Sequence, residues 1–372
     1  MKKIISTILL LLCCSILFAD VTDTNLRKKI AQMIIVGFNG TEITKDNPIY
    51  EDIINENISG VILFSKDIAK LKANEKDTTK NIKSPKQLKK LIKQINKLSP
   101  GKLFIAIDEE GGQISRLPAS MGFNAKTLSH KQLGEKDDTE LTYNQSKKIA
   151  KNLKSLGINI NFAPCVDLAI NKESSVIYKK ERSFSDNPQI VSKHAQAYIQ
   201  AHNKYNILTV AKHFPGHGSA INDSHSGFTD ISFTWKKEEL NPYIELNKKW
   251  LLNAVMIAHV YNRRLDKTYP ASLSKRVITD ILKKQIKFKG LIFTDDMQMN
   301  AISDNYTLED SIIIAINAGN DILIFGNNMK HDKDIAKKFN DIVFNAVKTG
   351  KISKDRIEES YSKIISIKSF LK

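Results

Sequence analysis

The chain of 372 residues is 41% hydrophobic and 26% charged, ordinary values for a globular protein that exclude a disordered or collagen-like chain. Lysine and arginine number 57 against 40 acidic residues, a formal net charge of +17, but only seven of the 57 are arginine. Arginine is the usual residue for recognising phosphates and bases, and the lysines are spread along the whole chain. We therefore expect a solvated basic surface suited to anionic surroundings, and no binding to nucleic acid.

Residues 1–19 have the pattern of a secretory signal, with two lysines, an apolar run and the small residue Ala19 at a cleavage point. The run is short for a membrane span, so we expect no stable span after cleavage. Cys13 and Cys14 inside the run leave a lipid-anchored form open. Cleavage leaves Cys165 as a lone thiol, which cannot form an internal disulfide. The pattern predicts export to the periplasm or cell envelope.

Eight short apolar runs, mostly β-branched or aromatic at their centres, follow one another along the rest of the chain. Such runs are typical of strands that are buried on both faces of a sheet. The runs are Met33–Phe38, Gly60–Phe64, Leu103–Ile107, Ile158–Ala163, Leu208–His213, Val255–His259, Leu291–Thr294 and Asp321–Phe325.

Helical patterns alternate with these runs. Eight strands alternating with helices predict an α/β fold, a TIM-type (β/α)₈ barrel that forms a single catalytic domain over residues 20–372. A doubly wound open sheet is the alternative, but no G-x-G-x-x-G motif follows an early strand. The helical patterns are Pro85–Leu98, Glu140–Leu156, Pro188–Tyr205, Leu273–Gln285, Leu308–Ala318, His331–Val347 and, at the end of the chain, Lys354–Leu371.

Polar residues cluster where the apolar runs end. They are Asp108–Glu110, Asp167, Lys212–His213, His259 and Asp295–Asp296. In a barrel of this type the active site is built at the carboxyl ends of the strands. The clusters therefore predict one site that collects side chains from several strands.

The segment after the fifth run is rich in histidine and glycine. Asp223 lies two residues before His225, and an aspartate that accepts from one ring nitrogen raises the basicity of the other. We interpret this pair as an acid/base dyad. A metal site formed by His213, His217, Asp223 and His225 is an alternative, although a glycine-rich loop positions ligands poorly. A polar surface loop is a third interpretation.

Asp295 and Asp296 end the seventh run. Adjacent residues on a strand point in opposite directions, so only one carboxylate can face the mouth of the barrel. We assign Asp295 to the mouth as nucleophile and expect Asp296 to cap or support the next segment of the chain. A carboxylate nucleophile with an acid/base partner suggests glycoside hydrolysis through a covalent intermediate. Asp108 could accept from sugar hydroxyls, while Arg116 and Arg182 would donate.

Together these segments resemble family 3 glycoside hydrolases, in particular the bacterial β-N-acetylglucosaminidases that trim cell-wall fragments. The resemblance covers most of residues 25–350, and Lys212–Gly218 followed by Asp223–His225 is its most specific part. The other matching segments are Gly60–Phe64, Ile107–Gly112, Asn161–Asp167, Met256–His259 and Phe293–Met297.

The resemblance implies roles for individual residues. Asp295 matches the nucleophile, and His225, assisted by Asp223, matches the general acid/base. The sugar-binding positions of the family match Asp108, Arg116, Arg182, Lys212 and His213.

The family hydrolyses with retention, needs no metal or cofactor, and removes terminal β-linked N-acetylglucosamine, often from N-acetylmuramyl groups. Two departures occur, because the family commonly has Gln and Arg where this chain has Glu109 and Gln113. An extra carboxylate near the site bears on fine substrate preference.

We therefore expect a retaining exo-β-N-acetylglucosaminidase, monomeric and without cofactor, that acts on N-acetylglucosamine-containing saccharides or muropeptides. A non-catalytic envelope protein that binds wall glycans and a metal-dependent barrel hydrolase are the alternatives. Phosphate in place of water as the acceptor also stays open, because an imidazole acid/base would not repel an anion.

Overall fold

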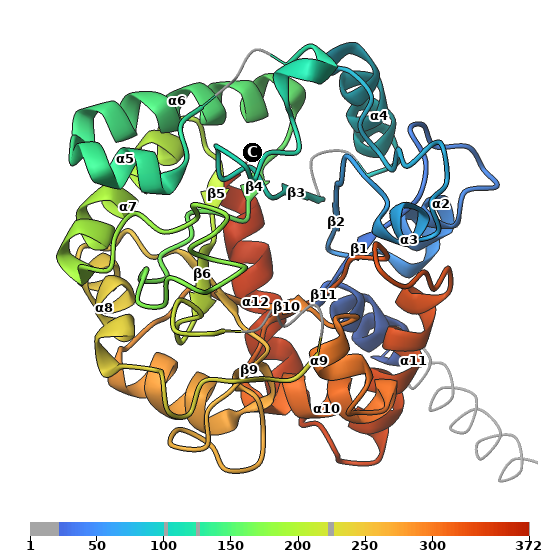
Figure 1. Cartoon of the computed structure of the whole chain (residues 1–372). Helices are drawn as coiled ribbons and strands as arrows, with labels where there is room; N and C mark the ends of the chain where they lie inside the picture. The colour runs from blue at the N-terminus through green and yellow to red at the C-terminus, as the bar shows by residue number, and fades with distance from the viewer. Residues whose placement is uncertain (1–21, 100–102, 124–126, 222–226, 372) are drawn as a thin grey trace, which may run out of the picture.

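The fold is a closed parallel barrel (Figure 1). The computed structural model describes residues 22–99, 103–123, 127–221 and 227–371. Nine parallel segments form one sheet in the order β5-β4-β3-β2-β1-β11-β10-β8-β6. The two end segments, β5 (Leu208–Thr209) and β6 (Ala211–Phe214), are separated only by Val210, so they are one strand. Because β5 pairs with β4 and β6 pairs with β8, this strand closes the ring of eight.

All eight predicted strands are present, and the closure excludes the open sheet. The TIM-type barrel predicted from the sequence is therefore confirmed. Strand interiors are fully buried, as the apolar runs require. The other strands of the barrel are β1 (Ile34–Gly37), β2 (Gly60–Ile62), β3 (Phe104–Ile107), β4 (Ile160–Asn161), β8 (Ala254–Ile257), β10 (Leu291–Asp296) and β11 (Ile322–Phe325).

Helices surround the barrel and follow the predicted pattern closely. One helix covers residues 22–31, and the segments Asp52–Glu56 (η1) and Arg276–Gln285 (η5) are π-helices rather than α-helices. The α-helices are α2 (Pro48–Glu51), α3 (Ile68–Lys72), α4 (Pro85–Leu98), α5 (His130–Lys136), α6 (Thr139–Leu156), α7 (Pro188–Asn203), α8 (Asn241–Lys248), α9 (Asn300–Ser303), α10 (Leu308–Ala318), α11 (Ile335–Lys348) and α12 (Lys354–Phe370).

Local signals explain where the helices begin and end. The Ser84 side chain accepts from the Gln87 amide and Pro85 occupies the first turn of α4, the arrangement that favours a helix start. Asn187 caps α7 in the same way. Gly157 ends α6 in the left-handed conformation, which glycine adopts without a Cβ clash. Among the described residues, no helix has the length and apolar character needed to cross a membrane.

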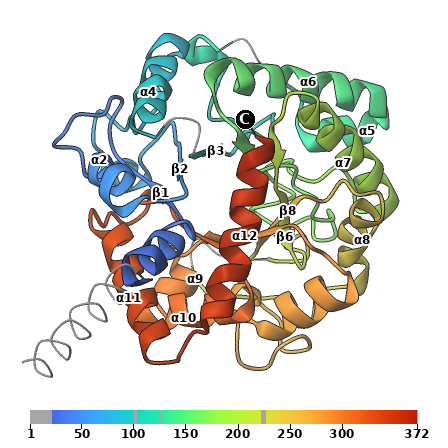
Figure 2. The ribbon, with the colours of Figure 1, turned by 180° about the vertical axis from the view of Figure 1, so that it is seen from behind.

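Helix α12 lies across the back of the barrel (Figure 2). Lys368 Nζ donates to the Ser59 carbonyl just before β2, and Arg356 Nη2 donates to Asp321 Oδ1 just before β11, at 2.9 Å. Both contacts are at the amino ends of strands, so α12 covers that end. The carboxyl ends of the strands therefore open toward the viewer of Figure 1.

The Arg356–Asp321 ion pair allows a test of how much α12 stabilises this end of the barrel. Asp321 is fully buried, so we expect Arg356→Ala to lower the free energy of unfolding by about 3 kcal/mol, because it leaves a buried carboxylate under-compensated. Urea unfolding followed by circular dichroism measures this. Lys284→Ala removes an exposed pair with Asp280 and should give no measurable change. Equal effects of the two variants would contradict the assignment.

Candidate active site

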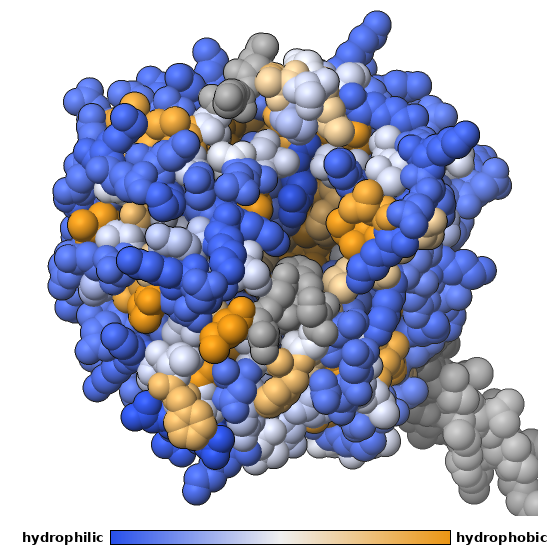
Figure 3. All heavy atoms as spheres, in the orientation of Figure 1, coloured by the Kyte–Doolittle hydropathy of each residue, from blue (hydrophilic) through white to orange (hydrophobic). Residues whose placement is uncertain are grey.

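A hollow lies at the centre of the face formed by the carboxyl ends of the strands (Figure 3). Asp108 and Glu110 follow β3, and Lys212 and His213 belong to β6. Asp295 is the second-to-last residue of β10, which lies two strands further around the barrel from β6. The fold therefore gathers predicted site residues that are far apart in the sequence.

Lys212 is the centre of a buried ion-pair cluster. Its Nζ lies 2.8 Å from Asp108 Oδ1 and 2.8 Å from Glu110 Oε1. Arg116 Nη2 lies 3.5 Å from the other oxygen of Asp108. Lys212 and Glu110 are almost inaccessible, whereas Asp108 and Arg116 keep part of their side chains exposed. The cluster thus runs from the interior to a surface that a ligand can reach.

Arg182 extends the cluster to the histidine of β6. Its Nη2 and Nε donate to the two oxygens of Glu110 at 2.7 and 3.0 Å, the bidentate geometry that a guanidinium favours. The same Nη2 lies 3.2 Å from His213 Nε2. Since a guanidinium can only donate, His213 Nε2 accepts and Nδ1 carries the proton. His213 Nδ1 then donates to Asp167 Oδ2 at 2.7 Å.

The network is electrostatically balanced. Burial on its own would raise the pKa of Glu110, but Arg182 and Lys212 outweigh it and hold that pKa well below its usual range. Lys212 and Arg116 likewise lower the pKa of Asp108 against the effect of burial. Burial would also raise the pKa of Asp167, but the interaction with His213, which includes the hydrogen bond from Nδ1, keeps it below its usual range. Asp108 and Glu110 therefore pair with the three cations Arg116, Lys212 and Arg182, and Asp167 adds a third ionised carboxylate that contacts the network through His213.

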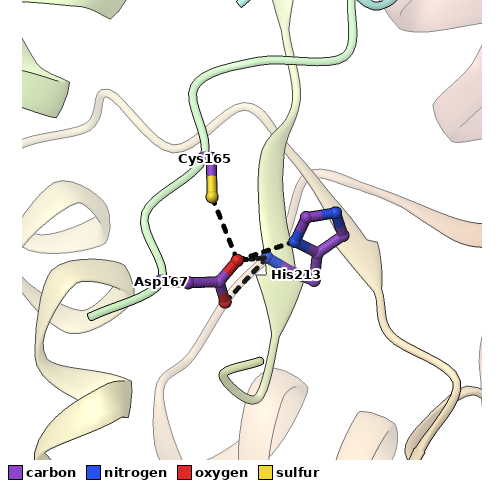
Figure 4. A group of neighbouring side chains, drawn as sticks. All are labelled: Cys165, Asp167 and His213. Carbon is purple, nitrogen blue, oxygen red and sulfur yellow. Dashed lines mark hydrogen bonds and ion pairs between the residues drawn. The ribbon is translucent and has the colours of Figure 1, made fainter. Parts of the chain in front are cut away.

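Cys165, Asp167 and His213 bring side-chain S, O and N atoms within 4.8 Å of one another (Figure 4). This resembles a metal-ligand set, but the donors do not fit one. The proton on His213 Nδ1 occupies the lone pair that a metal would need. Burial raises the pKa of the Cys165 thiol well above its usual value, and only the thiolate is a good ligand. The thiol instead donates to Asp167 Oδ2.

The segment after β6 is anchored before it reaches the predicted dyad. The His217 amide donates to Asp167 Oδ1 at 2.8 Å, and Trp235 Nε1 donates to the Pro215 carbonyl at 3.0 Å. Gly218 packs so closely that a Cβ would lie 1.7 Å from the Leu168 carbonyl oxygen. The predicted dyad Asp223 and His225 lies outside the described residues.

Asp296 has the hydrogen bonds of a supporting residue. Its Oδ1 accepts from the Gln298 and Gly326 amides, each at 3.0 Å, and its carbonyl accepts from His259 Nε2 at 3.0 Å. Asp295 Oδ1 accepts from the Asp296 amide at 2.8 Å. Asp296 is thus held by backbone donors, as a supporting residue would be, and the assignment of Asp295 as nucleophile stays a prediction.

Glu109 is turned away from its neighbours in the cluster. Its Oε2 accepts from the Arg116 and Leu117 amides at 2.8 and 3.2 Å, so it shapes the segment that carries Arg116. Burial raises its pKa to about 7. The extra carboxylate that the sequence placed near the site thus has a structural role.

The five predicted sugar-binding residues all lie in this one network. Sequence reasoning missed two members that connect them, Glu110 and Asp167. Both follow apolar runs and were visible as polar strand ends. Their partners, however, are distant in the sequence, since Arg182 is 72 residues from Glu110, and no local pattern indicates such pairs.

Known proteins share this fold and sequence. The family model "Glycosyl hydrolase family 3 N terminal domain" matches residues 25–367. Beta-hexosaminidase A of Pseudoalteromonas piscicida is 31% identical over 340 residues, which are 86% of this chain and 55% of that protein. A beta-hexosaminidase of Hydrogenovibrio crunogenus is 32% identical over 292 residues, 75% of this chain and 74% of that protein.

A solved structure is also similar. The glycoside hydrolase family 3 beta-N-acetylglucosaminidase from Paenibacillus sp. str. FPU-7 superimposes with a TM-score of 0.82 at 28% identity, covering 93% of this chain and 62% of that one. This chain therefore spans little more than half the length of some relatives and about three quarters of others.

Glu109 makes stability depend on pH. Its folded pKa of about 7 lies above the ordinary value of 4.5, so the folded chain holds a proton that the unfolded chain has lost. Stability should therefore fall as pH rises from 4.5 through 7. Glu109→Gln keeps an acceptor for the two amides and removes the ionisation. We expect it to be more stable than the parent at pH 8, by up to about 3 kcal/mol.

Urea unfolding at pH 5 and pH 8 checks this expectation. The exposed Glu140→Gln is the matched control and should leave the pH dependence as it is. If Glu109→Gln shows the same pH dependence as the parent, the buried proton is not on Glu109.

Proposed function

Because this chain belongs to glycosyl hydrolase family 3, we propose that it is a retaining exo-β-N-acetylglucosaminidase. It would remove terminal β-linked N-acetylglucosamine through a covalent glycosyl-enzyme intermediate. The observation that carries the proposal is the balanced network of Asp108, Lys212, Glu110 and Arg182 at the same end of the barrel as Asp295. Relatives with beta-hexosaminidase and beta-N-acetylglucosaminidase activities in their names support the same class.

The network suits a neutral sugar. Its charges cancel, so it offers a pyranose strong donors and acceptors without selecting for a charged group. Asp108 and Arg116, the partly exposed members, would bind ring hydroxyls, with Lys212, Arg182 and His213 completing the binding site. His213 would present one fixed tautomer, because Arg182 and Asp167 determine its proton.

The proposed reaction has two steps. Asp295 attacks the anomeric carbon and forms a C–O bond while the glycosidic C–O bond breaks, and the leaving oxygen takes a proton from His225. Water then attacks the same carbon and gives its proton to His225, and the bond to Asp295 breaks. Two inversions give net retention. Asp223 would orient the imidazole.

We further propose that the substrates are cell-wall saccharides or muropeptides outside the cytoplasm, hydrolysed by a monomer without a cofactor. The signal pattern of residues 1–19 supports export to the periplasm or envelope. The net charge of +17 suits anionic surroundings.

The nucleophile is tested by Asp295→Asn. The variant keeps the shape of the side chain but cannot attack, so kcat for p-nitrophenyl N-acetyl-β-glucosaminide should fall by about 10⁴-fold or more. The exposed Asp280→Asn is the control and should retain full activity. Full activity in Asp295→Asn would sink the assignment. Binding of chito-oligosaccharides by the parent without any turnover would favour the glycan-binding alternative.

The acid/base role is tested by His225→Gly with leaving groups of different basicity. A dinitrophenolate needs no proton to depart, so its glycoside should be cleaved much faster by the variant than an unactivated alkyl glycoside. We expect the selective loss for the alkyl glycoside to be about 10²-fold or more. Uniform loss across leaving groups contradicts the role. Sugar phosphate formed in phosphate buffer would show that phosphate rather than water is the acceptor.

A further inference from the structure

Aromatic side chains gather at one side of the mouth of the barrel. The rings of Phe228 and Tyr261 lie 5.2 Å apart with a tilt of 39°. Strands β7 (Thr229–Asp230) and β9 (Val260–Tyr261) pair to form a small separate sheet. Phe228 directly precedes β7, and Tyr261 is the last residue of β9. Hydrophobic side chains are visible on this part of the rim of the hollow, around the place of β9 (Figures 1 and 3).

Two further tyrosines join this pair. The rings of Tyr269 and Tyr306 lie 6.4 Å apart. Burial raises the pKa of Tyr306, and Tyr269 and Tyr261 lie near enough to raise it further. Phe228, Tyr261, Tyr269 and Tyr306 come from the connections that follow β6, β8 and β10, and we call these four residues the aromatic platform.

The platform is exposed to solvent, and the Tyr261 side chain in it is held by a hydrogen bond. Phe228 is 55% exposed, and exposed apolar surface beside a site is typical of a ligand-binding surface. The Tyr261 hydroxyl donates to the Lys267 carbonyl at 2.6 Å, and the Arg263 amide donates to Ser232 Oγ at 2.8 Å. These bonds order the sheet before a ligand arrives, which lowers the entropic cost of binding.

The platform lies next to the proposed nucleophile. Tyr261 follows His259 by two residues, so their Cα atoms are at most about 8 Å apart. The ring of His259 donates to the carbonyl of Asp296, the neighbour of Asp295, at 3.0 Å. In the cluster, Asp108 and Glu110 follow β3, while Lys212 belongs to β6, the strand that also precedes Phe228. Consider a glycoside whose terminal sugar lies on that cluster and whose anomeric carbon lies at Asp295. Its leaving group would then lie beside the platform.

We propose that the aromatic platform binds the leaving group of the substrate, and that this group is a β-linked pyranose. The inference rests on the proposed function. A pyranose whose substituents are equatorial has two faces of axial C–H bonds, which pack against aromatic rings, while tyrosine hydroxyls can meet its polar edge. The platform therefore favours saccharides over glycosides of small alcohols.

The test compares two substrates that differ only in the leaving group, N,N′-diacetylchitobiose and methyl N-acetyl-β-glucosaminide. The methyl group is too small to cover the rings. We expect Phe228→Ala and Tyr261→Ala each to lower the ratio of kcat/KM for the disaccharide over the methyl glycoside by about tenfold. Phe228→Tyr, which keeps a ring, should retain most of the ratio. Phe370→Ala is the control, because Phe370 is 73% exposed on α12 at the opposite end of the barrel.

The outcomes separate the two proposals. If the parent hydrolyses both glycosides and the alanine variants leave the ratio unchanged, the platform does not bind the leaving group and the proposed function stands. If the parent hydrolyses neither glycoside, the proposed function fails and the platform fails with it. A concentration-dependent dimer that Phe228→Ala abolishes would assign the surface to a second copy of the chain and overturn the proposal.

Discussion

The site depends on one buried interaction, the contact of Glu110 with Arg182 and Lys212. Glu110 accepts hydrogen bonds from Nε and Nη2 of Arg182 and also forms an ion pair with the ammonium of Lys212. All three side chains are almost inaccessible to solvent. A buried charge is tolerated only when it is paired and hydrogen-bonded. Glu110 therefore holds Lys212 toward Asp108 and Arg182 toward His213. Without Glu110, Arg182 would lose its paired carboxylate and Lys212 would keep only Asp108 as a partner.

In this arrangement each side chain fixes the orientation of the next through a hydrogen bond. Arg182 can only donate, so it selects one tautomer of His213, and that tautomer donates to Asp167. Two of the three atoms that resemble a ligand set, the Cys165 sulfur and His213 Nδ1, therefore carry protons that they donate to Asp167. The sequence left a metal site open because it shows which residue types are present but not which nitrogen carries the proton. The donor direction of a guanidinium places the proton on His213 Nδ1, whereas Asp223 and His225, two other members of the metal set predicted from the sequence, lie outside the described residues.

The sequence predicted the barrel well because its strands are buried on both faces and thus read as continuous apolar runs. Helices α4 and α10 were predicted with their observed bounds, since Ser84–Pro85 and Gly319 mark their ends locally. The segment Arg276–Gln285 was expected to be helical but not π-helical, because side-chain periodicity does not distinguish the two over so short a length. At the site, each predicted sugar-binding residue was found in the network, whereas Glu110 and Asp167, which join them, need contacts that only the closed barrel creates.

Asp167 connects the buried ion-pair network with the segment that follows β6. One of its oxygens accepts from the His217 amide and the other from His213 Nδ1 and the Cys165 thiol. The close contact of Gly218 with the Leu168 carbonyl leaves that stretch no room for a larger residue. A displacement of the His217 backbone would disturb the same carboxylate that fixes the His213 ring. The His213 ring of the network and the backbone at His217 are therefore held in place by a single buried side chain, that of Asp167.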